Sequence, residues 1–346
     1  MEKGAQQYIW EGEIPLQIHL HDSEVTTLPP PLPALIMAPR IGYLPLLSSK
    51  LKPFFSGALP PGVDTIWFDY KGLPLKWYIP TGVLFDLLCA EPERPWNLTV
   101  HYRGYPGNVL IPWDGEDSVK WSYINSLKEA AYIIHGSSKN VMNMSHPDQV
   151  DLWGSVMDGK LETYNHISSK LKLGVVSDEF SEKIKPSPSK AHHSLNDTEA
   201  NAALKTSRIP VRLYLRTFNE DFDDLEEAPF IDNWDQLSYI NRPVEINEQG
   251  KYFTLLDAVK SVLPEFYPDS LNTIKSEVKN EQSVEPEEEG VETRRLPGQP
   301  VIKLLRIQGI EPKMEIPFSW VVNNLMNPDY FLYICLYIKA PKLVGT

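Results

Sequence analysis

Two stretches of the chain read Gly72-Leu73-Pro74-Leu75-Lys76-Trp77-Tyr78-Ile79-Pro80 and Gly309-Ile310-Glu311-Pro312-Lys313-Met314-Glu315-Ile316-Pro317. Gly, Lys, Ile and Pro recur in them at a constant offset of 237 residues, from position 72 to position 309. In each copy an apolar strand precedes the glycine, and a short helical stretch follows the Ile-Pro pair, where proline commonly opens a helix. We therefore predict a strand, a tight turn at the glycine, a helix and a closing strand in both halves of the chain.

The residues around these stretches also correspond. In the first copy we predict strands over 14–20, 34–38, 65–70 and 98–102, and helices over 43–55 and 81–88. The helix over 43–55 is expected to bury Leu44, Leu47, Leu51 and Phe54, which share one helical face. In the second copy we predict strands over 209–215, 243–246, 302–307 and 331–338, and helices over 255–263 and 318–326. Each copy reads β-β-α-β-β-α-β, the order of a ubiquitin-like β-grasp, although chance echoes in an α+β chain are an alternative.

Between the copies the apolar spacing is helical. A helix is predicted over 117–134, ended by Gly136. A second helix is predicted to begin at Ser145-His146-Pro147 and to continue to about Leu171. Its expected apolar face consists of Val150, Trp153, Val156, Met157, Leu161 and Tyr164. The chain between the two copies therefore forms a helix-rich module.

The predicted fold class is α+β, with two ubiquitin-like β-grasp domains flanking a helix-rich domain. The expected boundaries are 1–11 for an N-terminal helical segment, 12–105 for the first ubiquitin-like domain, 115–175 for the helix-rich domain, 176–207 for a disordered linker, and 208–340 for the second ubiquitin-like domain, with a disordered acidic insertion at 272–297. Both disordered stretches have too little apolar content to bury a core. The acidic cluster 220–227 is either a solvated loop or a docking site for a basic partner.

The composition and the charge of the chain argue against several classes of protein. With 33 Lys+Arg against 46 Asp+Glu, the net charge is −13, which argues against a sequence-independent grip on nucleic acid. The longest apolar run, 330–338, is far shorter than the about 20 residues of a membrane-spanning helix. The start of the chain lacks the pattern of a secretory signal. Only two cysteines are present, which fits a reducing compartment. We expect a cytoplasmic protein.

Motifs for catalysis are absent. There is no phosphate-binding glycine loop, no zinc-protease motif and no nucleophile elbow. Asp221-Phe222-Asp223 lacks the rest of a calcium loop, and His192-His193 lies in a polar linker. Cys335 is expected in the core, whereas Cys89 with His101 is a possible nucleophile and base. We therefore expect no catalytic residue, cofactor or metal, with a Cys89-dependent thiol enzyme as the alternative.

Several segments resemble the autophagy protein 5 family. The signature stretch is 67–80, continuing through 82–88, and the family pattern is also present at 9–15, at 125–130 and at 309–312. These motifs lie in both predicted ubiquitin-like domains and in the helix-rich domain. The longer, more acidic insertion in the second domain resembles the plant members of the family.

The resemblance implies a scaffold rather than an enzyme. In the family, a lysine of the helix-rich domain forms an isopeptide bond with the C-terminal glycine of the ubiquitin-like autophagy protein 12. Lys128, within Ser126-Leu127-Lys128-Glu129-Ala130, is the matching position. The activated thioester is carried by an E2-like conjugating enzyme, so Lys128 needs only exposure and orientation. One alternative is a ubiquitin-like adaptor that is never conjugated.

The resemblance also implies partners. A helix of autophagy protein 16 is expected in a groove between the domains, for which the segment Gln6 to Trp10 and the many aromatic residues are candidates. The assembly is expected to act E3-like, promoting lipidation of autophagy protein 8 on phosphatidylethanolamine during autophagosome formation. Contact with pre-autophagosomal membranes is expected to be peripheral, and contact with nucleic acid is not expected.

Overall fold

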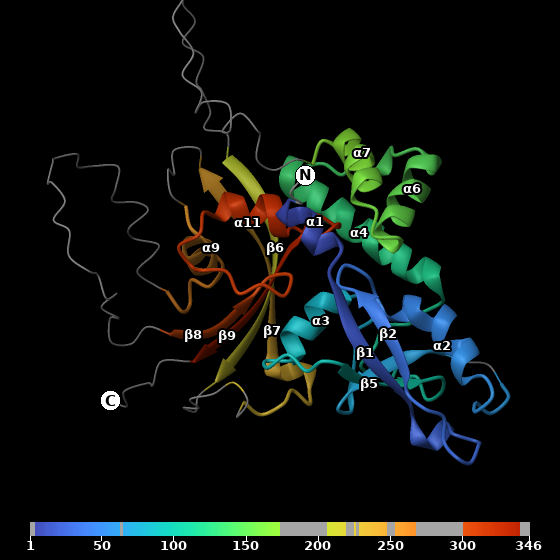
Figure 1. The fold of residues 1–346 in the computed structure, drawn as a ribbon. Helices are drawn as coiled ribbons and strands as arrows, with labels where there is room; N and C mark the ends of the chain where they lie inside the picture. The colour runs from blue at the N-terminus through green and yellow to red at the C-terminus, as the bar shows by residue number, and fades with distance from the viewer. Residues whose placement is uncertain are drawn as a thin grey trace, which may run out of the picture.

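Two separate sheets, joined by a group of helices, organise the chain (Figure 1). The computed structural model describes residues 4–62, 65–173, 206–218, 225, 228–247, 253–267 and 300–339. We call the part around the first sheet the first module, the helices after it the helical module, and the part around the second sheet the second module. In Figure 1 the second module lies on the left, the first at the lower right and the helical module above the first.

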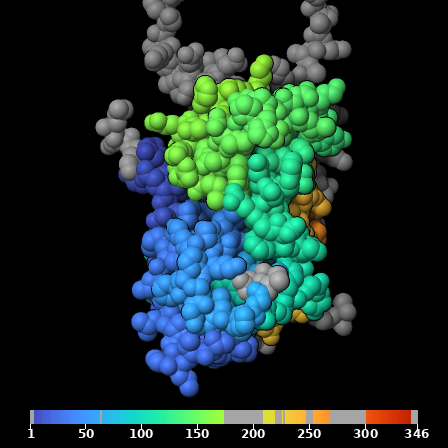
Figure 2. Space-filling view, turned by 90° about the vertical axis from the view of Figure 1, so that its right-hand side faces the viewer, coloured from blue at the N-terminus to red at the C-terminus, as the bar shows by residue number. Residues whose placement is uncertain are grey.

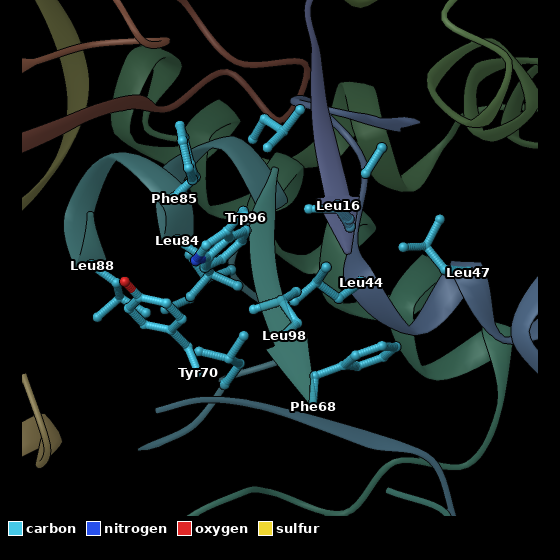
Figure 3. Packing of buried hydrophobic residues seen from close by; sticks show 14 of the residues in the cluster. Leu16, Leu44, Leu47, Phe68, Tyr70, Leu84, Phe85, Leu88, Trp96 and Leu98 are labelled. Atoms are coloured by element: carbon cyan, nitrogen blue, oxygen red, sulfur yellow. The ribbon is translucent and has the colours of Figure 1, made fainter. Parts of the chain in front are cut away.

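The first module is a five-stranded mixed sheet with helices on one face. Its strands are β1 (Glu13–Leu20), β2 (Ala34–Pro39), β3 (Trp67–Tyr70), β4 (Leu73–Pro74) and β5 (Trp96–His101), in the order β2-β1-β5-β3-β4. The first and last strands, β1 and β5, run parallel at its centre. The helices α2 (Ser48–Phe55) and α3 (Thr81–Leu88) complete the core, which is built around the fully buried Trp96 (Figure 3).

The second module repeats this arrangement with four strands, because the counterpart of β4 is only an isolated bridge between Ile307 and Ile310. Its strands are β6 (Thr206–Phe218), β7 (Leu237–Asn247), β8 (Val301–Arg306) and β9 (Leu332–Lys339), in the order β7-β6-β9-β8. Here β6 and β9, the counterparts of β1 and β5, are the parallel central pair. The helices are α9 (Leu255–Val262) and α11 (Phe318–Leu325). The two predicted β-grasp folds are therefore confirmed.

The repeated sequence forms the same turn in both modules. Lys71 and Gly72 have φ values of +51° and +87°, and Gln308 and Gly309 have +54° and +76°. Two successive residues with positive φ make the two-residue hairpin turn that matches the twist of the flanking strands. The prolines that close the repeats, Pro80 and Pro317, immediately precede α3 and α11. These are the positions predicted from the sequence.

The helix predicted over 43–55 differs in its buried face. It begins as a 3-10 turn, η2 (Leu44–Leu47), and continues as α2. Because a 3-10 turn has about three residues rather than 3.6, the face rotates along the segment. Phe54, expected in the core, is 53% exposed, whereas Phe55 is buried. The prediction for Phe54 was wrong for this reason.

The helical module contains α4 (Glu116–His135), α5 (Lys139–Met142), α6 (His146–Met157) and α7 (Leu161–Leu171). The helix α4 matches the prediction and ends at Gly136, which has φ +68°. The single helix expected from 146 to 171 is two helices, because the chain turns at Gly159, where φ is +65°. Val150, expected on the apolar face, is 45% exposed. Ser145 caps α6, since its hydroxyl accepts a hydrogen bond from the Asp148 amide.

Short helical turns complete the description. The N-terminal helix α1 (Ala5–Trp10) precedes β1, the turn η1 (Asp22–Glu24) follows β1, and η4 (Trp234–Gln236) precedes β7. The expected linker over 176–207 lies outside the described residues up to 205, and the insertion at 272–297 lies wholly outside them. So does the acidic cluster 220–227, apart from Leu225. The exact domain boundaries therefore stay a prediction.

The three modules share their cores. The cluster that fills the first module includes Tyr214, Trp234 and Phe331 of the second module. In α1, Ile9 packs into the core of the second module, while its neighbour Trp10 packs into the helical module. The first and helical modules form one continuous face (Figure 2). The modules are consequently held in a fixed arrangement, and sites can form between them.

Candidate functional site

The helix α4 presents one face to the core and another to solvent. Its core face buries Val119, Tyr123, Ile124, Leu127, Ala130 and Ala131. Lys128 projects from the other side, where Trp121, Asn125 and Tyr132 follow the same helical spacing. Trp121 and Tyr132 are 54% and 64% exposed, and Lys128 is half-buried. Lys128 is thus flanked by two exposed aromatic side chains on one helical stripe.

The amine of Lys128 has few partners. Its Nζ donates to Asn125 Oδ1 at 3.5 Å, a long hydrogen bond at the surface. Within the described part of the chain, no carboxylate forms an ion pair with Lys128. The sequence placed Lys128 on a helix with a free face, and the geometry agrees with that placement.

The residue after Lys128 fixes the helix in place. Glu129 accepts hydrogen bonds from Arg212 Nη2 and from Asn241 Nδ2, both at 2.6 Å. Arg212 Nη1 also donates to Ser126 Oγ at 3.0 Å. Since Arg212 lies on β6 and Asn241 on β7, these contacts tie α4 to the sheet of the second module. These hydrogen bonds therefore fix the turn of α4 that carries Lys128 to the sheet of the second module.

Arg212 is itself enclosed. Its guanidinium lies 3.6 Å from the centre of the Phe331 ring, and its Nη1 donates to Tyr333 Oη at 2.8 Å. The buried Asp329 lies 3.6 Å away and accepts a hydrogen bond from Tyr333 at 2.7 Å. Burial raises the pKa of the Asp329 carboxyl, while the nearby Arg212 cation opposes the shift. The cation and its partners form one desolvated network under α4.

A groove opens beside α4, between all three modules. It has a volume of about 650 Å³. Its walls come from the segment 76–79 of the first module, from α4 with the residues before it, and from the strands of the second module. Six of the lining side chains are aromatic: Trp77, Tyr78, Trp121, Tyr214, Tyr239 and Tyr333. Such a surface fits an apolar helix or peptide of a partner.

The polar groups of the groove are few. Lys76, Glu129 and Arg212 are its charged residues. Burial lowers the pKa of Lys76, although Asp235 opposes this. Burial raises the pKa of Tyr78 and of Tyr239, so both hydroxyls stay protonated at neutral pH and are available as donors. The groove therefore combines aromatic contact area with a small number of directional groups, as ligand-binding grooves do.

The N-terminal segment lies elsewhere. Gln6 and Trp10 line a second hollow of about 170 Å³, together with residues of α7 and α11. An α-helix with its side chains is about 10–12 Å across, so this hollow accepts side chains rather than a helix. The structure thus places the two groove candidates in different hollows, of which the aromatic groove is the larger.

Comparison with known proteins places this geometry in a family. Models of autophagy protein ATG5 match the chain in three parts: the UblA domain over residues 9–102, the alpha-helical bundle region over 116–174 and the UblB domain over 208–336. Autophagy protein 5 of Arabidopsis thaliana is 61% identical over 343 residues, covering 99% of this chain and 100% of the relative.

The chain belongs to the autophagy protein 5 family.

Further relatives agree with this assignment. Autophagy protein 5 of Oryza sativa subsp. indica is 51% identical over 365 residues, covering 98% of this chain and 94% of the relative. The crystal structure of Kluyveromyces marxianus Atg5 superposes with a TM-score of 0.58 at 20% identity, covering 96% of this chain and 98% of that one. The latter similarity supports the fold alone. The resemblance seen in the sequence motifs, including the likeness to plant members of the family, is confirmed.

The thiol alternative finds no support in the geometry. Cys89 is buried at the end of α3, and burial raises the pKa of its thiol to about 12. His101 does not face it: its Nε2 lies 2.5 Å from Asp69 Oδ2, and its Nδ1 lies 3.9 Å from Glu24 Oε1. In the described residues no hydrogen bond joins Cys89 to His101. Cys335 is also buried, as expected for a core residue.

The described residues were compared with the requirements of a membrane-spanning helix and of a metal site. None of their helices is both long and apolar enough to cross a bilayer. They also contain no group of three or more His, Cys, Asp or Glu side chains arranged to hold a metal ion. His192-His193 and Asp221-Phe222-Asp223, considered above as metal ligands, lie outside the described residues.

Sequence reasoning missed the residues that position Lys128. Arg212 occupies a polar position of a predicted strand, and nothing in its neighbours connects it to a helix more than 80 positions earlier. The sequence holds one signal. Arg212 alternates with the apolar residues of its strand, and the matching position of the first copy is the neutral Gln17. Such a difference between copies indicates a contact that one module makes and the other does not.

Proposed function

We propose that this member of the autophagy protein 5 family is the acceptor for autophagy protein 12, joined through Lys128. The observation that carries the proposal is that Lys128, within the family motif, lies on the free face of α4 with no ion-pair partner among the described residues. The Glu129–Arg212 contacts hold the same turn of the helix, so the amine is presented from a rigid support.

The proposed conjugation transfers an acyl group from a thioester to the amine of Lys128. Lys128 Nζ, once it has lost a proton, attacks the carbonyl carbon of the thioester at the C-terminal glycine of autophagy protein 12. The new N–C bond forms as the C–S bond breaks, and the cysteine of the E2-like conjugating enzyme leaves as a thiol or thiolate. No further oxidant or reductant is needed. The acceptor protein supplies position, and it supplies no catalytic residue of its own.

The acceptor is tested by Lys128→Arg. The change keeps the positive charge and the helix propensity but removes the nucleophilic amine. With purified autophagy protein 12, its activating and conjugating enzymes and ATP, we expect the wild-type chain to give a conjugate band on a denaturing gel and the variant to give none.

A matched control lies on the same helix. Lys120→Arg changes another lysine of α4 and is expected to leave the band unchanged. Mass spectrometry of the conjugate should find a branched peptide at Lys128. A conjugate that survives Lys128→Arg would reject this acceptor, and a chain never modified in its native cells would favour the adaptor alternative.

We further propose that the groove of about 650 Å³ binds a helix of autophagy protein 16. Its aromatic walls suit the apolar face of an amphipathic helix, and Arg212, Glu129 and the protonated tyrosines suit polar side chains at its edges. Because the walls come from three modules, the partner would bind only the assembled molecule.

Trp121→Ala tests the groove. The side chain is 54% exposed, so its loss should leave the fold intact while removing an anchor of about 2 kcal/mol or more. Isothermal titration with the autophagy protein 16 helix should show weaker binding. Trp320→Ala, which removes a 40% exposed tryptophan from α11 outside the groove, is the matched control. Equal affinities of the two variants would place the helix elsewhere.

The assembled conjugate is proposed to act E3-like. It would bring the lipid-conjugating E2-like enzyme to a membrane by peripheral contact, in the cytoplasm, and so speed lipidation of autophagy protein 8. Liposomes containing phosphatidylethanolamine provide the assay. The purified conjugate is expected to accelerate lipidation, and the unconjugated Lys128→Arg chain is not. Equal rates with both would remove conjugation from this step.

A further inference from the structure

The loop between β1 and β2 carries a proline-rich segment that is largely exposed to solvent. It reads Leu28-Pro29-Pro30-Pro31-Leu32-Pro33. Leu28 and Leu32 are 96% and 79% exposed, the most exposed large apolar side chains of the described residues. The loop forms the lower right tip of the ribbon in Figure 1. No part of the chain that the structure describes covers these two leucines.

Both ends of the segment are anchored. Before it, the amide and hydroxyl of Thr26 donate to the carbonyl of Ala58 at 2.9 and 2.8 Å. After it, Ala34 enters β2 and pairs with Ile18 of β1. Four of the seven residues between Thr26 and Ala34 are prolines, which have no N–H to donate and a fixed φ. The chain bends over 27–29, where the Leu28–Pro29 peptide bond is cis, and Pro30–Pro33 then continues to the fixed start of β2, so this part has little conformational entropy to lose on binding.

We propose that Pro30–Pro33 is a docking site for a WW-type domain. The sequence Pro-Pro-Leu-Pro favours the polyproline II conformation, which repeats about every three residues, so Pro30 and Pro33 lie on the same ridge. Aromatic-lined grooves of WW and SH3 domains recognise such ridges. Leu32 projects beside the ridge and supplies the apolar side chain that a WW groove reads.

The flanking charges favour a WW groove over an SH3 groove. SH3 ligands add a Lys or Arg next to the prolines, which an acidic pocket of the domain binds. From position 23 to position 39 this chain has no Lys or Arg, and the one acid, Glu24, is buried. The nearest cation in sequence, Arg40, is engaged by Asp86 at 2.5 Å.

The apolar surface continues past the segment. Leu35 and Met37 are 74% and 49% exposed on β2, which is the edge strand of the first sheet. A domain seated on Pro30–Pro33 would cover neighbouring parts of this strip, whose exposure the isolated chain does not explain. The site lies in the first module, apart from α4, and does not depend on conjugation at Lys128.

The test uses the full chain and a WW domain of the class that reads Pro-Pro-Leu-Pro. The ¹⁵N-labelled domain is titrated with the unlabelled chain, and chemical-shift changes are followed at its groove aromatics. Leu32→Ala is expected to weaken binding by about tenfold or more, as truncation of an anchor does. Because Leu32 is 79% exposed, this change leaves no cavity and should not shift the unfolding temperature.

Controls keep the result specific. Pro61→Ala, in an exposed Pro-Pro pair of another loop, and Lys128→Arg should both bind the domain as the wild type does. An SH3 domain is titrated in parallel. Absence of shifts in the WW groove, equal affinity of Leu32→Ala and wild type, or preferential binding of the SH3 domain would each overturn the proposal.

Discussion

Gly72 and Gly309 occupy matching positions in the two modules, yet a methyl group added at each would meet different surroundings. At Gly72 nothing lies within 4 Å of an added Cβ. At Gly309 the guanidinium carbon of Arg40 would lie 2.7 Å away. The Gly309 amide also donates to Asp86 at 2.7 Å, and Asp86 holds Arg40 at 2.5 Å. One turn of the repeat is free, and the other is part of the contact between modules.

The difference predicts unequal costs for one substitution. Gly72→Ala should cost about 1 kcal/mol of stability, the strain of a positive φ at a residue with a Cβ. Gly309→Ala should cost at least about 2 kcal/mol more, because it also displaces a buried cation from its partner. Urea unfolding of both variants measures this. Equal losses would mean that the Arg40–Asp86–Gly309 contact contributes little.

The thiol of Cys89 should be inert at neutral pH. Its pKa is raised to about 12, so the reactive thiolate forms only at high pH. We expect a thiol-reactive probe to label the native chain slowly at pH 7 to 8, with a rate that rises with pH and shows no plateau in that range. Labelling is followed by mass spectrometry, with guanidinium-unfolded chain as the fast control. Rapid labelling of Cys89 at pH 7 would support the alternative of a Cys89-dependent thiol enzyme.

Among the elements, α4 has several polar contacts with one distant residue, Arg212. Arg212 on β6 contacts Ser126 and Glu129 of the helix and Tyr333 of β9. A lysine at this position would have one amine in place of a planar guanidinium and would leave some of these acceptors without a donor. Under the proposed function, the strength of this contact sets how firmly Lys128 is held for conjugation.

Arg212→Lys should therefore destabilise the chain by about 2 kcal/mol or more and slow formation of the conjugate. Arg208→Lys is the matched control on the same strand, because Arg208 and its partner Glu245 are both more than half exposed and such pairs contribute little. Thermal unfolding and single-turnover conjugation measure the two effects. An unchanged conjugation rate in a destabilised Arg212→Lys would show that presentation of Lys128 does not need this contact.

The elements also show what a sequence specifies by itself. The turns at Gly72 and Gly309, the helices after Pro80 and Pro317 and the end of α4 at Gly136 are local events, decided by residues with restricted backbones. They were predictable. The edge strand β7 runs over 237–247, much longer than the predicted 243–246, because its polar residues are tolerated on an exposed edge.

Some parts of the candidate site could likewise be predicted from the sequence and others could not. Lys128 was predicted from the family motif alone, and its role as the acceptor stays a prediction. The groove walls and the Arg212 network could not be predicted, because they join residues of different modules through packing that leaves no periodic trace in the chain. The resemblance implied a groove and the many aromatic residues were candidates for it, but some of them proved to be core: Trp96 and Trp153 are buried, whereas Trp121 is exposed and lines the groove.

Across the whole molecule, α1 connects parts that are distant in sequence. Ile9 is a core residue of the second module, although that module begins nearly 200 positions later. Ile9→Ala should destabilise the second module by about 2 to 4 kcal/mol. Hydrogen exchange of the α11 amides, against which α1 packs, should accelerate accordingly. Tyr8→Ala is the control, since Tyr8 is 64% exposed; matching exchange rates in both variants would contradict a structural role for α1.

The placement of α1 has a consequence for synthesis on the ribosome. Ile9 lies more than 300 positions before Leu325, the end of the helix α11 that it packs beside. At a translation rate of about 5–20 residues per second, roughly 15 to 60 s pass between the two. Throughout that interval Ile9 lacks its partners in the second module, whereas the residues that pack around Trp10 in the helical module are already made. The contact between α1 and α11 is therefore expected to be among the last to form during synthesis.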